Sequence, residues 1–177
     1  MASSATELSP RAREIVDAAR ELLEAEGPEG LSMRRIADRI GIRAPSIYKH
    51  LPDKQALEAA LMSAAFEELA GHYEAAVAGA DDALAAIARA YRDQARRHPH
   101  LYRLMTENPL ARERLVPGVE ERAAAPIVEA VGDPDGARAM WAFAHGMTIL
   151  ELNGRFPPGA DLDAAWAKGI AAFRRPR

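Results

Sequence analysis

The sequence predicts an all-α protein, with a small N-terminal helix-turn-helix domain followed by a larger helical bundle. Alanine, the best helix former, accounts for 39 of the 177 residues. Apolar residues recur at spacings of three and four between glycines and prolines, and no segment alternates with the period of two expected for a strand. A chain of this length buries roughly 70% of its unfolded surface, so a core can form without crosslinks.

The first predicted helix covers residues 9–26. Ser9 supplies an N-terminal cap, and Pro10 suits the first turn because its missing N–H would be unpaired there. Gly27 and Pro28 end the helix.

Two short helices follow. Ser32 caps the second, whose sequence is MRRIADRI, and Gly41 is placed to end it after about nine residues. Ala44-Pro45 opens the third, which includes SIYKHL and turns Ile47 and Leu51 inward. The opposite face is polar, basic and aromatic.

The rest of the chain is punctuated by glycine and proline into further helices, for nine or ten in all. Their predicted ranges are 54–79, 81–97, a short segment from residue 98 to 105, 107–115, 118–131 with a break or kink at Pro126, 135–153 and 161–173.

The charge is distributed unevenly along the chain. The net charge is −3, but residues 31–54 contain six basic and two acidic residues. From residue 56 onward there are 14 basic and 17 acidic residues. A small basic module therefore precedes a mildly acidic body, and we expect Arg34, Arg35 and Lys54 to lie near phosphates if the module binds DNA.

The pattern of short helix, glycine turn and short helix is typical of a helix-turn-helix. The second short helix would then project into a DNA major groove. The alternatives are a solvated charged face, a surface that docks an acidic protein, or a small-molecule-sensing module without sequence-specific DNA binding. Preference for one palindrome over random duplex would separate DNA recognition from protein docking.

The segment LSMRRIADRIGIRAPSIYKHLPDKQALEAAL resembles the DNA-binding domain of the TetR family of bacterial transcriptional regulators, with the match covering residues 10–61. The resemblance implies a cytoplasmic, ligand-responsive repressor that binds a palindromic DNA operator as a homodimer. It implies DNA contacts at Arg34, Arg43, Ala44, Pro45, Ser46, Tyr48, Lys49, His50 and Lys54.

Two positions depart from the family pattern. Arg43 stands where serine or threonine is common, which makes it a candidate base reader, because arginine is the commonest specific partner of guanine. A phosphate-bound or solvent-exposed role for Arg43 is nearly as well supported. Leu51 replaces the usual phenylalanine, which affects core packing rather than function.

The segment MWAFAHGMTILELNGRFP resembles a TetR subgroup with a Trp-His-Gly C-terminal domain. The resemblance implies dimerisation through the helices at 135–153 and 161–173, and an unknown small-molecule effector. Trp141 and His145 share a helix face and line either the effector pocket or the dimer interface. The candidate effector-binding residues are Tyr73, Tyr91, Tyr102, Met105, Trp141 and His145.

These observations predict three parts: a flexible arm at residues 1–9, a DNA-binding domain at 10–55, and a ligand-binding and dimerisation domain at 56–177.

Other function classes find little support. The chain has no cysteine, and none of its five histidines forms an i, i+4 pair with another. No nucleophile elbow or phosphate loop is present, so we expect no enzyme activity, no metal and no cofactor. The longest uncharged stretch is 139–150, which is too short to cross a bilayer, and the N-terminus lacks a signal segment. We therefore expect an intracellular protein without a membrane partner.

Overall fold

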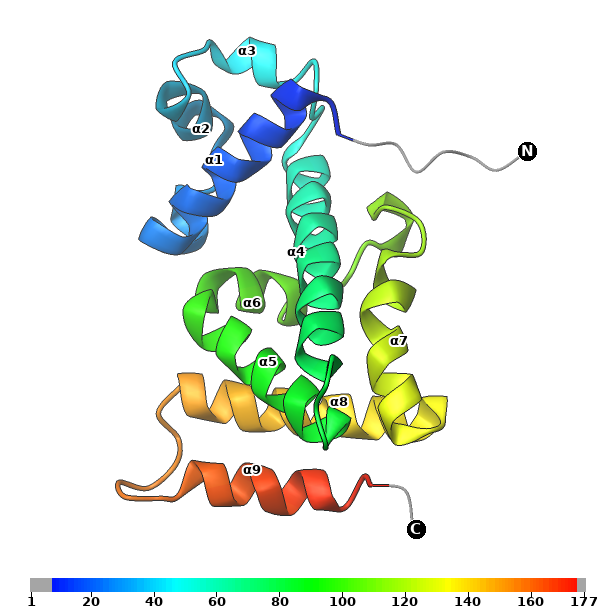
Figure 1. Ribbon diagram of the computed structural model, residues 1–177. Coiled ribbons are helices and arrows are strands. Elements are labelled where there is room, and N and C mark those ends of the chain that lie inside the picture. Colours follow the sequence, from blue (N-terminus) through cyan, green and yellow to red (C-terminus); the bar gives the residue numbers. More distant parts are fainter. Residues whose placement is uncertain (1–7, 175–177) are drawn as a thin grey trace, which may run out of the picture. The chain divides into compact units, whose positions relative to one another are not determined.

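The structure is a computed structural model and describes residues 8–174 (Figure 1). Within that range the regular elements are helices and no strand occurs, as the sequence predicts. The α-helices are α1 Pro10–Glu26, α2 Met33–Arg39, α3 Ala44–Ile47, α4 Lys54–Val77, α5 Ala83–Arg97, α6 Pro99–Thr106, α7 Val119–Val131, α8 Pro134–Leu152 and α9 Leu162–Ala171. Two 3₁₀-helices are η1 Gly27–Gly30 and η2 Arg112–Arg114.

The chain forms two compact units. Unit 1 comprises Met1–Phe66 and His98–Val119, and unit 2 comprises Glu67–Arg97 and Glu120–Arg177. Each unit therefore combines two separate stretches of the chain, and α4 contributes to both. The domain boundaries expected at residues 9 and 55 stay predictions, and residues 1–7 of the expected arm lie outside the described residues.

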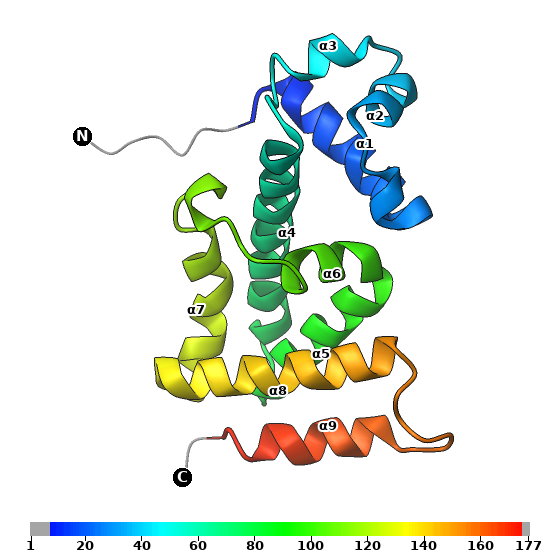
Figure 2. The same ribbon diagram turned by 180° about the vertical axis from the view of Figure 1, so that it is seen from behind.

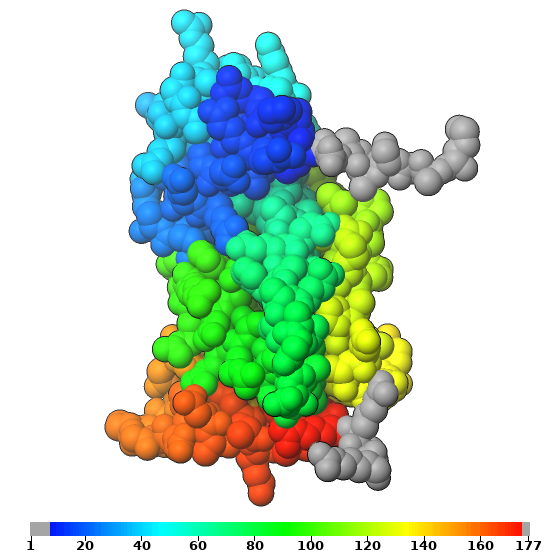
Figure 3. Space-filling view, viewed as in Figure 1, coloured from blue at the N-terminus to red at the C-terminus, as the bar shows by residue number. Residues whose placement is uncertain are grey.

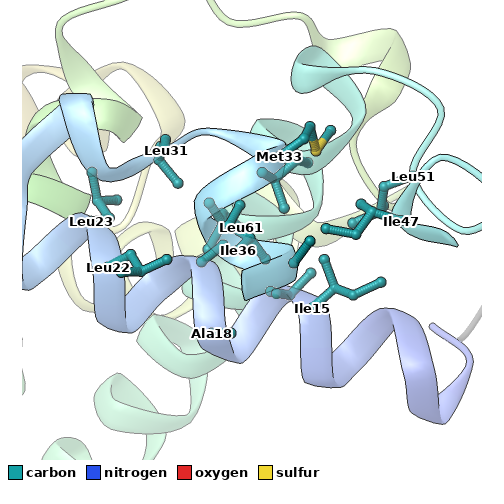
Figure 4. Close-up of a cluster of buried hydrophobic side chains, with 14 of the residues drawn as sticks. Ile15, Ala18, Leu22, Leu23, Leu31, Met33, Ile36, Ile47, Leu51 and Leu61 are labelled. Carbon is teal, nitrogen blue, oxygen red and sulfur yellow. The ribbon is translucent and has the colours of Figure 1, made fainter. Parts of the chain in front are cut away.

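A single apolar core holds the short helices of unit 1 together (Figure 4). Ile15 on α1, Ile36 on α2 and Ile47 on α3 have no solvent exposure. Leu57 and Leu61 on α4 close the same core. Because α2 has seven residues and α3 has four, neither would be stable as an isolated helix, and both depend on this burial.

Gly41 makes the turn between α2 and α3. Its φ of +68° lies in the left-handed region that glycine adopts without steric cost. The N–H of Ile42 donates to the carbonyl of Ala37 at 3.0 Å, and the N–H of Gly41 donates to that of Asp38 at 3.4 Å. These two bonds form a Schellman motif, so the predicted stop at Gly41 is confirmed.

The third helix is shorter than the sequence predicts. It ends at Ile47 instead of Leu51, and residues 48–50 form a hydrogen-bonded turn. The N–H groups of His50 and Leu51 both donate to the carbonyl of Ile47, at 2.8 and 2.9 Å. Pro52 follows at once, and a proline disfavours helical geometry in the residue before it.

The predicted helix at 107–115 is wrong. Outside η2, residues 107–118 are irregular, because Pro109 and Pro117 interrupt helical bonding. The segment is instead tied to α4: the N–H of Val116 donates to Ser63 Oγ at 3.0 Å. Downstream, α7 runs through Pro126 without a break.

In unit 2, α5 turns one face inward as predicted, with Leu84, Ile87, Ala88, Tyr91 and Ala95 buried. Both ribbon views show α8 and α9 side by side and antiparallel (Figures 1 and 2). The rings of Phe143 on α8 and Trp166 on α9 form a T-shaped pair, with ring centroids 5.7 Å apart.

Arg92 joins three helices of unit 2. From α5, its guanidinium makes a paired bond to Glu151 of α8, with Nε–Oε2 at 2.7 Å and Nη2–Oε1 at 3.0 Å. Its Nη1 donates to Asp163 of α9 at 2.5 Å, and the guanidinium lies 5.7 Å from the centroid of Trp166. The hydrogen bond to Glu151 is the largest cause that raises the pKa of Arg92. The guanidinium of Arg92 is permanently charged in proteins, so it stays available to both carboxylates.

None of the helices in the described part of the chain is long and apolar enough to cross a membrane.

We expect Ile47→Ala to destabilise unit 1 by about 2–5 kcal/mol, because Ile47 is the one fully buried side chain of α3 and its loss leaves a cavity. Urea unfolding measures the change. Gln55→Ala, at an exposed position on α4, serves as the control. Equal stability of the two variants would show that α3 is not held by this contact.

Candidate nucleic-acid interface

The surface of unit 1 around α3 is polar and exposed, opposite the buried Ile47. Arg43 stands at the N-cap of α3, and Arg43 and Pro45 are exposed while Ala44 and Ser46 are partly exposed. In the space-filling view this cyan segment forms part of the surface, with side chains projecting from it (Figure 3). Within the described residues of unit 1 this face is exposed or partly exposed, so it is accessible to another molecule.

The turn that follows α3 carries three more exposed side chains. Tyr48 is 50% exposed, an unusual fraction for a residue with a large aromatic side chain, and Lys49 and His50 are exposed beside it. Because Ile47 anchors the preceding helix, these side chains project from a fixed backbone.

Ion pairs divide the basic residues of this module into two groups. Arg35 pairs with Glu26 of α1, and Arg39 Nη2 lies 2.7 Å from Glu21 Oε2, also of α1. In contrast, Arg34, Arg43 and Lys49 are exposed and form no ion pair with any residue in 8–174. Their full charge is available to an anionic partner.

Lys54 is the first residue of α4 and follows Asp53, whose carboxylate caps this helix. Its Nζ lies 3.5 Å from Glu58 Oε1. The preceding residue, Asp53, accepts the N–H of Ala56 at 2.7 Å, and Arg114 Nη1 donates to both of its carboxylate oxygens at 3.1 and 3.2 Å. The bond from Ala56, with a smaller contribution from Arg114, lowers the pKa of Asp53 below its ordinary value of 3.8.

The nine residues expected to contact DNA thus lie in one unit and are all exposed or partly exposed. The side chains of Arg34, Tyr48, Lys49 and His50 belong to α2 or to the turn after α3. A contact of any of these residues with DNA stays a prediction.

The six expected effector-binding residues fall in different units. Tyr73 and Tyr91 are buried in unit 2, and Tyr102 is buried in unit 1, where Met105 is partly buried. The rings of Trp141 and His145 stack on α8 in unit 2, with centroids 5.9 Å apart. Trp141 is 48% exposed, so its ring is open to solvent in a single copy of the chain.

Sequence reasoning missed the partners that hold the module in place. Glu24 of α1 accepts the N–H of Leu101 at 2.8 Å and so caps α6, while Glu21 and Glu26 neutralise arginines on α2. These acidic residues recur along α1, but their partners are distant in sequence, so no local signal indicates them.

Among residues 8–174, no group of three or more acidic, histidine or cysteine side chains is placed to hold a metal ion. The arrangement offers a short exposed helix flanked by the positively charged Arg43 and Lys49 and anchored by the buried Ile47. It can contact phosphates through its charges and base edges through the N-terminal face of α3. These features define the class of helix-turn-helix DNA-binding proteins.

The family follows from comparison with known domains. Residues 15–61 match the domain described as bacterial regulatory proteins, tetR family. Residues 84–173 match the tetracyclin repressor-like C-terminal domain. The chain belongs to the TetR family.

Individual relatives agree with this assignment. The chain is 30% identical over 151 residues to an uncharacterized HTH-type transcriptional regulator of Mycobacterium tuberculosis, spanning 79% of this chain and 69% of that protein. It is 32% identical over 107 residues to an HTH-type transcriptional repressor of Streptomyces coeruleorubidus, spanning 60% of this chain but only 40% of that one. A solved protein of unknown function from Rhodococcus sp. RHA1 superimposes with a TM-score of 0.78 at 27% identity, covering 97% of each chain.

The protein is therefore a DNA-binding transcriptional regulator. Its family is one of regulators rather than of enzymes.

We expect Arg34→Ala to reduce the salt dependence of DNA binding, whereas the neighbouring Arg35→Ala leaves it unchanged. The unpaired Arg34 would release about one counterion on meeting a phosphate, but Arg35 is already neutralised by Glu26. The magnitude of the negative slope of log affinity against log salt concentration should decrease by about 0.9 for Arg34→Ala only. Identical slopes in both variants would show that the ion pairs of α2 do not decide which arginine meets DNA.

Proposed function

We propose that this regulator is a repressor that binds a two-fold symmetric operator as a homodimer and is released by a small-molecule effector. The observation that carries the proposal is the exposed face of α3, with Arg43 at its N-cap and Tyr48 and Lys49 just beyond it, held out by the buried Ile47. A helix presented in this way can enter a major groove.

The proposed dimer forms through α8 and α9. Two large apolar side chains of α8, Trp141 and Leu150, are 48% and 41% exposed in the single chain. The three-way contact of Arg92 with Glu151 and Asp163 supports a fixed arrangement of the two helices. A two-fold axis would place two copies of α3 on half-sites about one DNA turn, or roughly 34 Å, apart.

We also propose that the C-terminal domain is of the Trp-His-Gly type. The stacking of Trp141 on His145, with Gly146 next in sequence, supports this assignment. The exposure of Trp141 favours a role of the pair at the dimer interface over a role in the effector pocket. Tyr73 and Tyr91 are proposed as effector-binding residues of unit 2, and Tyr102 and Met105 of unit 1.

An effector would act by population shift. Such a ligand binds more tightly to a conformation in which the two α3 helices are wrongly spaced for the operator. The loss of DNA-binding free energy is limited by the difference between the ligand's binding free energies for the two conformations. Repression then ends because the operator-bound conformation is depleted.

Selection from a random duplex library at moderate salt tests the proposal. We expect enrichment of one two-fold symmetric sequence, because a symmetric dimer presents two identical DNA-binding surfaces to the two half-sites. Absence of enrichment with folded, dimeric protein would point to docking of a protein partner instead.

We predict that Arg43→Ala relaxes base preference at one position in each half-site, because an arginine contact to guanine supplies about 1–3 kcal/mol of discrimination. Repeating the selection with the variant measures this effect. Arg39→Ala is the matched control, since Arg39 is engaged by Glu21. An unchanged consensus with Arg43→Ala would exclude Arg43 from base reading.

We predict that Trp141→Glu or Leu150→Glu weakens dimerisation about tenfold or more, because either change would bury an unpaired charge in the interface. Sedimentation velocity over a concentration series measures the dimer constant. Ala75→Glu adds the same charge at an exposed position of α4 and serves as the control. If both α8 variants stay as dimeric as the control, the interface lies elsewhere.

A further inference from the structure

Ser9 makes a contact that its role as a helix cap does not require. Its Oγ lies 3.5 Å from Nδ1 of His50, a residue 41 positions further along the chain. The same oxygen accepts the N–H of Ala12 at 3.2 Å and thereby caps α1. Ser9 therefore links the start of α1 to the turn that follows α3.

The two contacts use different parts of the hydroxyl group. A serine hydroxyl accepts through its lone pairs and has one hydrogen to donate. Because the bond from Ala12 uses only a lone pair, the hydrogen remains available for His50. Ser9 can therefore cap α1 and donate to the imidazole at the same time.

Donation to Nδ1 determines which imidazole tautomer is present. A neutral histidine carries one hydrogen, so the nitrogen that accepts a hydrogen bond leaves the hydrogen on the other nitrogen. If Ser9 donates to Nδ1, His50 keeps its hydrogen on Nε2. The side chain of His50 is exposed beside Tyr48 and Lys49, so an Nε2–H group is accessible to a phosphate oxygen.

We propose that Ser9 is a positioning residue for DNA binding: its hydroxyl orients the ring of His50 and holds it in the tautomer that donates from Nε2 to a backbone phosphate. Ser9 acts through His50 and needs no DNA contact of its own. The inference rests on the proposed function, in which His50 meets the DNA backbone.

Two substitutions separate this role from helix capping. Glycine at an N-cap retains nearly all of the helix stability that serine provides, so Ser9→Gly removes the hydroxyl with little effect on folding. We expect Ser9→Gly to weaken binding to the selected palindrome about fivefold, in line with the loss of one oriented hydrogen bond. Ser9→Thr keeps the hydroxyl and should bind as the unchanged chain does, with thermal unfolding as the check on stability.

A double-mutant cycle with His50→Ala tests whether Ser9 acts through the imidazole. We expect His50→Ala alone to weaken operator binding, and Ser9→Gly to cause no further loss in the His50→Ala background. Additive losses would overturn the proposal, because Ser9 would then act on DNA binding independently of His50. No loss from Ser9→Gly in the unchanged background would overturn it as well.

The tautomer can be read in the absence of DNA. Long-range ¹H–¹⁵N spectra of the full chain labelled with ¹⁵N-histidine distinguish protonated from unprotonated ring nitrogens, and the signals of His50 are those lost in His50→Ala. We expect Nε2–H in the unchanged chain and a mixture of tautomers in Ser9→Gly. Spectra that are identical in the two proteins would overturn the proposal.

These readouts keep two failures apart. If the unchanged chain selects no duplex, the proposed function fails, while the NMR result still shows whether Ser9 sets the tautomer. If a palindrome is selected but His50→Ala binds it normally, the regulator stands and the positioning role of Ser9 in DNA binding is overturned.

Discussion

Burial of Ile47 against the core of unit 1 is the contact on which the proposed DNA-reading surface depends. The helix that presents this surface has four residues, too few to be stable by its own hydrogen bonds. It persists because Ile47 packs in one cluster with Ile15 and Ile36, while the left-handed Gly41 sets the turn that leads to it. The outward face of α3 can then be exposed or partly exposed, since the opposite face supplies the stabilising contacts.

Ion pairs determine which basic side chains of this module keep their charge available for a partner. The module looks uniformly basic along the sequence, yet acidic residues of α1 engage Arg35 and Arg39. Fewer basic residues have no acidic partner in the described part of the chain. Two of these residues, Arg43 and Lys49, flank α3. Because exposed ion pairs contribute little to stability, the main consequence of the pairing is to concentrate the available positive charge near the reading helix.

In unit 2, polar contacts hold α5, α8 and α9 in a defined arrangement, although large apolar side chains of α8 are exposed. Arg92 makes these contacts from α5 with a two-pronged bond to Glu151 and a third bond to Asp163, and it also lies over Trp166. Removing either acidic partner would leave a partly buried guanidinium less well compensated. The exposed Trp141 therefore lies on a helix that Arg92 connects to α5 and α9.

The sequence by itself determined the helical class, most helix boundaries and the Gly41 turn, because caps, prolines and apolar periodicity act within a few residues. It did not determine where α3 ends or that residues 107–118 leave the helical path, since Pro52 and Pro109 are compatible with several local outcomes. The family pattern predicted which residues between Arg34 and Lys54 contact DNA, and these residues are exposed or partly exposed. Only the tertiary structure decided which of its charges are paired and that Ser9 meets His50, because those contacts join residues far apart in the chain, where no local pattern records which side chains meet.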